Sequence, residues 1–374
     1  MRSNYKQLGE FIRQVDVRNT EGKEENLLGV SVQKLFIPSI ANTVGTDFSK
    51  YKVVKRGQFT YIPDTSRRGD KIGIALLEDY DEGLVSNVYT VFEVVDTHKL
   101  IPEYLMLWFS RPEFDRYARY KSHGSVREVL DWDEMCKVEL PVPSYEEQLE
   151  IVKNYRTISE RIVLKQKIND NLEATAQAYF DNLFFCGTEN DCTLADIATV
   201  NPVRQLSKGQ MARCFDMATL PTNGCIPTGD TIKPYNGGVR FKNGDTLIAR
   251  ITPCLENGKA AYINILNDGE VAFGSTEYIV FASKDDMPSC FYYFLIRNSK
   301  FVTFALQFMN GSSGRQRVSG EELASFPMQK PTKESLEAFE QVGSLALEQM
   351  KTHTEEIELL KQLQETITAI LSSR

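Results

Sequence analysis

The chain has few histidines and no paired cysteine motif. Its three histidines, His98, His123 and His353, are too few and too dispersed to suggest a metal site. The seven cysteines are scattered, form no C-x-x-C pair and are odd in number. This pattern argues against a disulfide framework or a zinc knuckle. We therefore expect reduced thiols, as in a cytoplasm, and no bound metal.

Long hydrophobic runs are also missing. No apolar run reaches the roughly 18 residues that a membrane-spanning helix needs. The opening residues, "MRSNYKQLGEFIRQV", lack the apolar core of a signal peptide. These two absences predict a soluble, cytoplasmic protein.

Motifs for catalysis and nucleotide binding are absent as well. There is neither a G-x-G-x-x-G nor a G-x-x-x-x-G-K-[ST] loop, so no cofactor or nucleotide site is indicated. "NPVR" at Asn201 lacks the second proline and the aromatic residue of the Asn-Pro-Pro-aromatic loop in amino-methyltransferases. No carboxylate cluster with a nearby lysine stands out as a nuclease site. The sequence therefore favours a non-catalytic protein without a cofactor of its own.

What the chain does contain is an internal repeat. "VKRGQFTYI" at 54–62 resembles "FKNGDTLIA" at 241–249, and "HGSVR" at 123–127 resembles the glycine- and arginine-containing "NGSSGRQR" at 310–317. The glycines within each pair of segments lie 187 positions apart, which is half of the 374 residues. Several matches at a nearly constant offset and in one order indicate a unit that occurs twice.

Each unit is predicted to contain a globular domain followed by a long helix. Short strand-like runs punctuated by Gly, Asn and Asp fill 1–143 and 186–331. Helices are expected at 144–185 and 332–374. The first begins after a proline pair, with Ser144 and Glu147 at the spacing of a capping box.

Both helices carry a heptad pattern, which is typical of coiled-coil pairing. In the first helix the heptad positions are Ile151, Tyr155, Ile158, Ile162, Leu172, Ala176, Tyr179 and Leu183, and the polar Glu147 and Gln148 at its start are also expected at the partner or coiled-coil surface. In the second helix the positions are Leu336, Phe339, Gly343, Ala346, Met350, Ile357, Leu360, Ile367 and Leu371. Polar residues at four seam positions are expected to set the register, namely Lys165, Asn169, His353 and Gln364.

An isolated heptad helix would most simply be a dimerisation device. Two helices of matching length in one chain favour an intramolecular antiparallel pair instead. The predicted fold is therefore α+β, with two pseudo-repeated domains separated by two long antiparallel coiled-coil helices. In this arrangement His353 is a seam residue and not a catalyst or a ligand.

Particular segments resemble a known family. "FDMATLP", "GDTLIARITPCLENGKAAYI" and "FGSTEYIVF", between 215 and 281, resemble the specificity subunit of type I restriction–modification enzymes. The helix start with Pro143, Glu147, Gln148 and Ile151 is also similar. The resemblance covers essentially the whole chain, including its order of target-recognition domain, helix, target-recognition domain, helix.

The resemblance implies a non-enzymatic subunit that binds double-stranded DNA. Each target-recognition domain would read one half of a bipartite site, while the helices would set the spacing and dock two modification (methyltransferase) subunits. These partners would supply the S-adenosylmethionine chemistry. A restriction subunit would add ATP-driven translocation and cleavage.

Two departures from the family pattern are visible. The family's Gly-Asp pair is kept at Gly244 and Asp245, but the first unit has Gln58 after its glycine. The second helix has Ser335 and Leu336 where Glu-Gln would stand. We expect the partner contact at the second helix start to differ from that at the first.

The net charge of −8 is unusual for a DNA-binding protein. The acidic excess lies mainly in the helices, where Asp and Glu exceed Lys and Arg by 7 to 5 in 144–185 and by 8 to 4 in 332–374. This distribution suits a protein-binding face on the helices, with recognition domains that are near neutral. The competing interpretation is a coiled-coil scaffold that joins two protein-binding domains without DNA.

Base readout needs polar side chains on loops that can enter a groove. The candidates for DNA contact are Arg67, Arg68, Lys71, Ser86, Asn87, Tyr89, Ser125, Arg127, Arg250, Thr252, Glu256, Asn257, Lys259, Ser275, Thr276, Glu277, Tyr278, Ser313, Arg315 and Arg317.

Overall fold

The computed structural model describes residues 5–22, 24–39, 45–65, 71–122, 128–187, 190–312 and 314–371. The chain divides into two compact units. Unit 1 contains Met1–Glu160 and Leu360–Arg374, and unit 2 contains Arg161–Leu359. Each of the two long helices therefore contributes one segment to each unit.

Unit 1 is built on a four-stranded antiparallel sheet in the order β2-β9-β6-β7. These strands are Ile12–Val15, Thr90–Val94, Phe59–Tyr61 and Ile74–Leu76. The described residues of this unit contain three further pairs of strands. β1 (Tyr5–Gln7) pairs with β10 (Glu139–Pro141), β3 (Leu28–Val30) with β4 (Phe36–Pro38), and β5 (Lys52–Lys55) with β8 (Glu82–Val85). The helices are η1 (Leu8–Glu10), η2 (Phe48–Lys50), α1 (Pro102–Phe109), α2 (Pro112–Lys121) and α3 (Trp132–Cys136). Phe59, Phe92 and Phe109 pack in the core between sheet and helices.

Unit 2 repeats this plan with a four-stranded antiparallel sheet in the order β12-β19-β16-β17. These strands are Ala198–Val200, Tyr278–Ser283, Thr246–Ala249 and Ala260–Tyr262. A second sheet, β14-β13-β18-β15, contains Thr231–Pro234, Met211–Phe215, Ala272–Gly274 and Val239–Phe241, and β13 and β18 are parallel. β11 (Cys192–Thr193) pairs with β20 (Pro327–Met328). The short helices are α5 (Leu194–Ile197), α6 (Cys290–Arg297), α7 (Ser299–Gln307) and α8 (Gly320–Ala324).

The predicted repeat is visible in the turns that precede β6 and β16. Gly57 and Gly244 both adopt positive φ, 82° and 86°, which favours glycine. In unit 1 the side-chain oxygen of Gln58 accepts a hydrogen bond from the Lys55 amide, at 2.8 Å. In unit 2 the Asp245 carboxylate accepts the corresponding bond from Lys242, at 2.9 Å. The Gly-Gln departure therefore keeps the oxygen that closes this turn.

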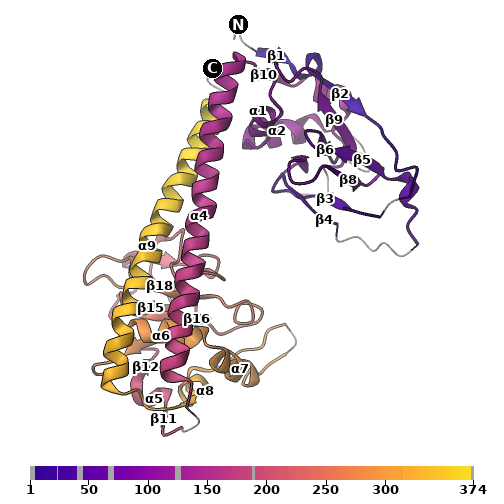
Figure 1. Cartoon of the computed structure of the whole chain (residues 1–374). Helices are drawn as coiled ribbons and strands as arrows, with labels where there is room; N and C mark the ends of the chain where they lie inside the picture. The colour runs from indigo at the N-terminus through magenta and orange to yellow at the C-terminus, as the bar shows by residue number, and fades with distance from the viewer. Residues whose placement is uncertain are drawn as a thin grey trace. The chain divides into compact units, whose positions relative to one another are not determined.

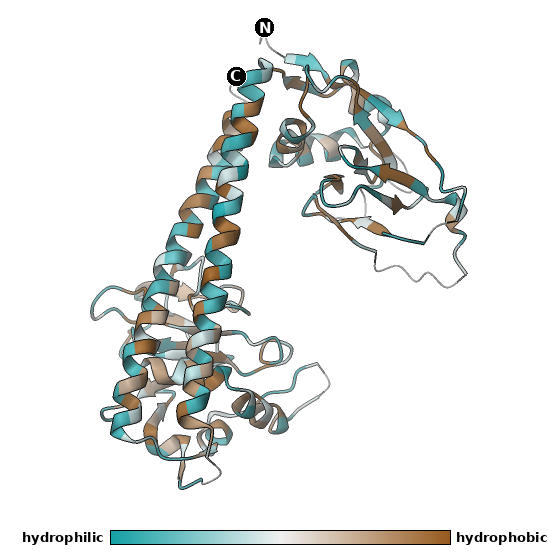
Figure 2. Cartoon of the chain, in the orientation of Figure 1, coloured by the Kyte–Doolittle hydropathy of each residue, from teal (hydrophilic) through white to brown (hydrophobic). Residues whose placement is uncertain are grey.

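The expected long helices are α4 (Tyr145–Phe184) and α9 (Lys333–Ile370). The capping box at the start of α4 is present, because Ser144 and Glu147 exchange hydrogen bonds of 3.1 and 3.3 Å. Figure 1 shows the two helices side by side, and Figure 2 shows hydrophobic residues recurring along both. Every heptad position named above, from Ile151 onwards, is buried or half-buried.

Polar pairs across the seam show that the helices are antiparallel. In unit 2, the Lys165 ammonium lies 2.9 Å from the Glu356 carboxylate, and the Oδ1 atom of Asn169 lies 2.8 Å from the Nδ1 atom of His353. In unit 1, Gln364 donates to the Ser159 hydroxyl at 2.7 Å. As residue numbers rise along α4, the numbers of their partners on α9 fall. The α+β fold with antiparallel helices is confirmed, and His353 is a seam residue as predicted.

Gln148, which we expected at the partner or coiled-coil surface, instead fixes α4 to its own domain. Its side chain is fully buried. The Oε1 atom accepts a hydrogen bond from the Ile101 amide at 2.9 Å, and Nε2 donates to the carbonyls of Lys99 and Pro143 at 2.9 and 3.0 Å. At the second helix start Leu336 packs against the core of unit 2. The two starts therefore differ in how each helix is anchored to its domain.

We expect Gln148→Leu to destabilise unit 1 by about 1–3 kcal/mol, because it leaves buried backbone groups without partners. Both tryptophans of the chain, Trp108 and Trp132, lie in unit 1 and pack against its core, so their fluorescence during urea denaturation reports on this unit. Glu150→Leu, at an exposed position two residues further along α4, is the control and should change little. Coincident transitions for the two variants would contradict the anchoring role.

Candidate nucleic-acid interface

Three loop segments of unit 2 meet at one end of its main sheet. They are 250–252, 275–277 and 315–317, which we call the three-loop edge of unit 2. Arg250 follows β16 and donates its backbone N–H to the Glu277 carbonyl at 2.9 Å. The Thr252 amide donates to the Gln316 carbonyl at 3.1 Å, and the Val318 amide donates to the Arg250 carbonyl at 3.0 Å. Backbone hydrogen bonds therefore hold the three segments in a defined arrangement.

Unit 1 has the same framework at 63–65, 86–88 and 128–129, the three-loop edge of unit 1. The Thr65 amide donates to the Glu128 carbonyl at 2.9 Å, and the Leu130 amide donates to the Pro63 carbonyl at 3.0 Å. The segment 86–88 lies at the same end, because β9 begins just after it and pairs Thr90 with Tyr61 of β6. Both units thus present loops from equivalent places.

Many candidate DNA-contact residues of unit 2 gather at this edge. Arg250, Ser275 and Glu277 are half-exposed, and Thr276 and Arg315 are exposed. Thr252 is largely buried, and its hydroxyl accepts the Gln316 amide at 3.1 Å. Glu256 and Asn257 are exposed on the turn that follows the first segment of the edge.

Two candidates of unit 2 are placed differently from the prediction. Tyr278 is only 1% exposed, and its hydroxyl donates to the Phe215 carbonyl at 3.0 Å. Tyr278 belongs to the core, because the side chain of this first residue of β19 faces inward. The Lys259 ammonium donates to the Met217 carbonyl at 2.6 Å and so closes a loop beside the edge.

In unit 1 the candidates are more scattered. Ser86, Asn87 and Tyr89 form the turn between β8 and β9, where Asn87 is exposed and Tyr89 packs partly into the core. Lys71 is exposed. Five further candidates lie outside the described residues, namely Arg67, Arg68, Ser125, Arg127 and Ser313.

A charged cluster marks the edge of unit 2. Arg317 donates to the Glu277 carboxylate from Nε at 3.0 Å and from Nη2 at 2.7 Å. These hydrogen bonds hold the pKa of Glu277 below its ordinary value, so the carboxylate stays ionised near neutral pH. Gln316, which the sequence reasoning did not single out, joins this loop to Thr252 through its backbone. Its only signal in the sequence is its position between two candidate arginines.

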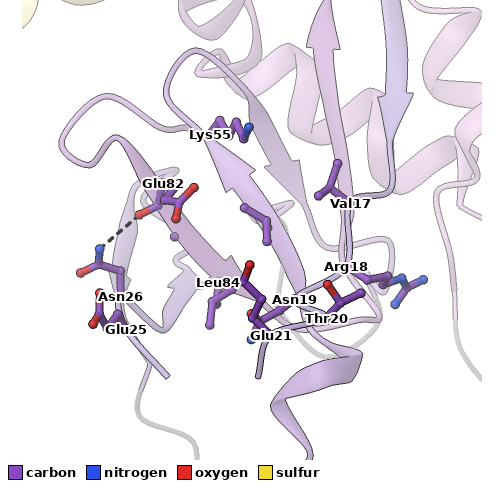
Figure 3. A pocket seen from close by; sticks show the side chains of 12 residues that line it. Val17, Arg18, Asn19, Thr20, Glu21, Glu25, Asn26, Lys55, Glu82 and Leu84 are labelled. Carbon is purple, nitrogen blue, oxygen red and sulfur yellow. Dashed lines mark hydrogen bonds between the residues drawn. The ribbon is translucent and has the colours of Figure 1, made fainter. Parts of the chain in front are cut away.

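A pocket of about 220 Å³ in unit 1 does not suit a phosphate (Figure 3). Among its lining residues are three carboxylates, Glu21, Glu25 and Glu82, against the two cations Arg18 and Lys55. Carboxylates in excess repel an anion. Arg56, which follows β5, is also engaged, because its guanidinium pairs with the Asp81 carboxylate at 3.0 Å.

No group of three or more His, Cys, Asp or Glu residues in the described part of the chain could hold a metal ion. Within the same residues, no helix is both long enough and apolar enough to cross a membrane.

Comparisons with known proteins agree on one family. The family described as "Type I restriction modification DNA specificity domain" matches residues 10–174 and 217–369. The type I restriction enzyme EcoEI specificity subunit of Escherichia coli is 30% identical over 145 residues, which are 37% of this chain and 24% of that protein. The EcoAI specificity subunit of Escherichia coli is 30% identical over 190 residues, which are 48% of this chain and 32% of that protein. The aligned segments thus span 24% and 32% of these relatives.

A solved structure shares the fold across nearly the whole chain. The S subunit of the type I restriction–modification system from M. genitalium matches with a TM-score of 0.59, covering 98% of this chain and 95% of that one. The two sequences are 12% identical in this alignment. At that identity the likeness concerns the fold alone.

Proposed function

Because the chain belongs to the family of type I restriction modification DNA specificity domains, we propose that it is the DNA-specificity subunit of a type I restriction–modification complex. Each unit reads one half of a bipartite site in double-stranded DNA. The chain is not itself an enzyme. It directs two methyltransferase subunits to the site, and a restriction subunit joins them in the full complex.

The observation that carries this proposal is the repeated three-loop edge. The backbone hydrogen bonds recur in both units, from Thr65 to Glu128 and from Thr252 to Gln316, while the side chains around them differ. A constant framework with different side chains is what two independent half-sites require. Loops also carry the contacts by which proteins read base edges.

The long helices have a second role in the proposal. Their paired length sets the number of base pairs that are not read between the two half-sites, and they supply surface for the methyltransferase subunits. The acidic excess of both helical stretches supports a protein partner rather than DNA on that surface. S-adenosylmethionine and ATP would bind to the partner subunits. The complex would act in the cytoplasm, a setting that suits seven free cysteines.

The test compares the purified chain alone with the chain bound to its modification subunits. The chain alone should show no methyl transfer, ATP hydrolysis or DNA cleavage. The complex should methylate a split sequence, which is found by base-resolved mapping of methylation in the source genome. Turnover of S-adenosylmethionine by the chain alone, or a complex that methylates without sequence preference, would contradict the proposal. A chain that binds protein partners but no duplex would point to the scaffold instead.

A further inference from the structure

The three-loop edge of unit 2 contains a charged cluster of three side chains. The Glu277 carboxylate is held by Arg317, and the Nε atom of Arg250 lies 3.8 Å from the same carboxylate. The side chains of Arg250, Glu277 and Arg317 are 32%, 25% and 39% exposed. The cluster is therefore ordered by its own contacts and still open to a ligand from solvent.

Among the described residues, two N–H donors of Arg317 have no partner. A guanidinium has five N–H donors. Nε and one N–H of Nη2 are directed to Glu277, and one N–H of Nη1 donates to the Arg315 carbonyl at 3.2 Å. One N–H on each terminal nitrogen is left without a partner among the described residues. Two such donors are what an arginine uses to bind O6 and N7 of guanine in the major groove.

The backbone at this position is also fixed. Arg317 exchanges two hydrogen bonds of 2.9 Å with Asn310, so its Cα cannot shift freely along the loop. Glu277 restrains the side chain from the opposite segment of the edge. Because the arginine is oriented before binding, less conformational entropy is lost when a base is bound.

Unit 1 shows that this ion pair is not needed to build the edge. Strand register and the shared backbone hydrogen bonds give the counterparts of Arg250, Glu277 and Arg317 in unit 1 as Pro63, Val88 and Val129. The backbone contacts are nevertheless kept, including the bridge between Asp64 and Val129 that corresponds to the one between Ile251 and Arg317. A purely structural ion pair would be expected wherever the junction forms. Its replacement by apolar residues in the same framework fits a role in readout.

We propose that Arg317, positioned by Glu277 and flanked by Arg250, reads a guanine in the half-site of unit 2. The inference rests on the proposed function and deepens it, because it assigns one base to one side chain. Glu277 acts as a positioning residue that holds the guanidinium of Arg317 in one orientation. Arg250 adds positive charge beside the base.

The experiment uses the complex of the full chain with its modification subunits and duplexes that contain the methylated site. Each guanine of the half-site assigned to unit 2 is replaced in turn by 7-deazaguanine, which lacks the N7 acceptor, or by adenine. At one position both replacements should weaken binding of the parent complex by about tenfold to a hundredfold. Arg317→Lys keeps the charge but loses the fork, so it should bind the parent duplex more weakly and lose discrimination at that position alone.

Two further variants separate readout from folding and from phosphate binding. The double variant Glu277→Val with Arg317→Val copies unit 1, so the edge should stay folded while discrimination at the same guanine is lost. Arg315→Ala, two residues away on the exposed loop, is the control and should lower affinity equally for every duplex. Glu277→Gln should retain the preference for guanine with a smaller ratio.

Some outcomes would overturn the inference and leave the proposed function intact. These are an equal loss of affinity for all duplexes in Arg317→Lys, or full discrimination in the double variant. Insensitivity of the parent complex to every guanine replacement in this half-site would do the same. A parent complex that binds no duplex in preference to another would instead contradict the proposed function itself.

Discussion

Inserting one heptad into each long helix is expected to lengthen the unread spacer of the DNA site by about three base pairs. Seven residues add about 10 Å to a helix at about 1.5 Å per residue, and DNA rises about 3.4 Å per base pair. The natural insertion points follow Glu160 in α4 and Leu359 in α9, because the two compact units divide there. An insertion at these points leaves the contacts within each unit in place.

The size of the insertion matters because the helices pack through a heptad seam. Seven residues return the apolar positions to the same face, with a drift of about 20° per heptad. Three extra base pairs rotate DNA by roughly 100°, at 10–10.5 pairs per turn. Affinity should therefore fall while both half-sites remain unchanged.

Methylation mapping of the variant complex gives the new spacing directly. An insertion of three or four residues in each helix is the control, and it should be worse because it rotates the seam away from its partner. A folded heptad variant that still methylates at the original spacing would mean that the partner subunits set the distance.

The second large effect is expected from Phe339→Ala, which should destabilise unit 2 by about 3–5 kcal/mol. Phe339 is fully buried, and its ring packs 5.0 Å from Phe180, 5.2 Å from Phe294 and 5.8 Å from Phe184. The residue thus joins α9 to the end of α4 and to α6 within one aromatic cluster. Removing it leaves a cavity that the surrounding rings cannot close.

Hydrogen exchange measured peptide by peptide distinguishes the two units. Protection should fall across unit 2, including α6 and α7, while the urea transition seen by Trp108 and Trp132 should change much less because both lie in unit 1. Leu345→Ala on the same helix is the control, since Leu345 is 62% exposed and its truncation should cost less than about 0.5 kcal/mol. Equal loss of protection in both variants would show that the cluster does not hold the unit together.

Several features followed from local sequence rules alone. The heptad spacing predicted the buried face of α4 and α9, because a helix places residues three and four apart on one side. The capping box at Ser144 and Glu147 marked the start of α4 within one residue. The spacing of 187 residues predicted two copies of one unit, and the matching sheets and turns agree with it.

Other features depended on contacts between segments that are distant in the sequence. Gln148 looked like a partner contact, but its three hydrogen bonds reach backbone groups near residues 100 and 143 that only the tertiary structure brings together. Tyr278 looked like a loop residue, yet the sheet turns its ring into the core. Periodicity reports which face of one element is buried, and it does not report what another element places against that face.

The charged cluster shows the same division most clearly. The sequence determined that Arg250, Glu277 and Arg317 are polar residues in loops, which made each of them a candidate separately. Only the tertiary structure decided that the two arginines meet at the carboxylate of Glu277, because hydrogen bonds tie the loops after β16, before β19 and before α8 to one another. The number of donors left on Arg317 depends on those partners. The proposed reading of guanine therefore rests on a fixed geometry that residue types alone do not specify.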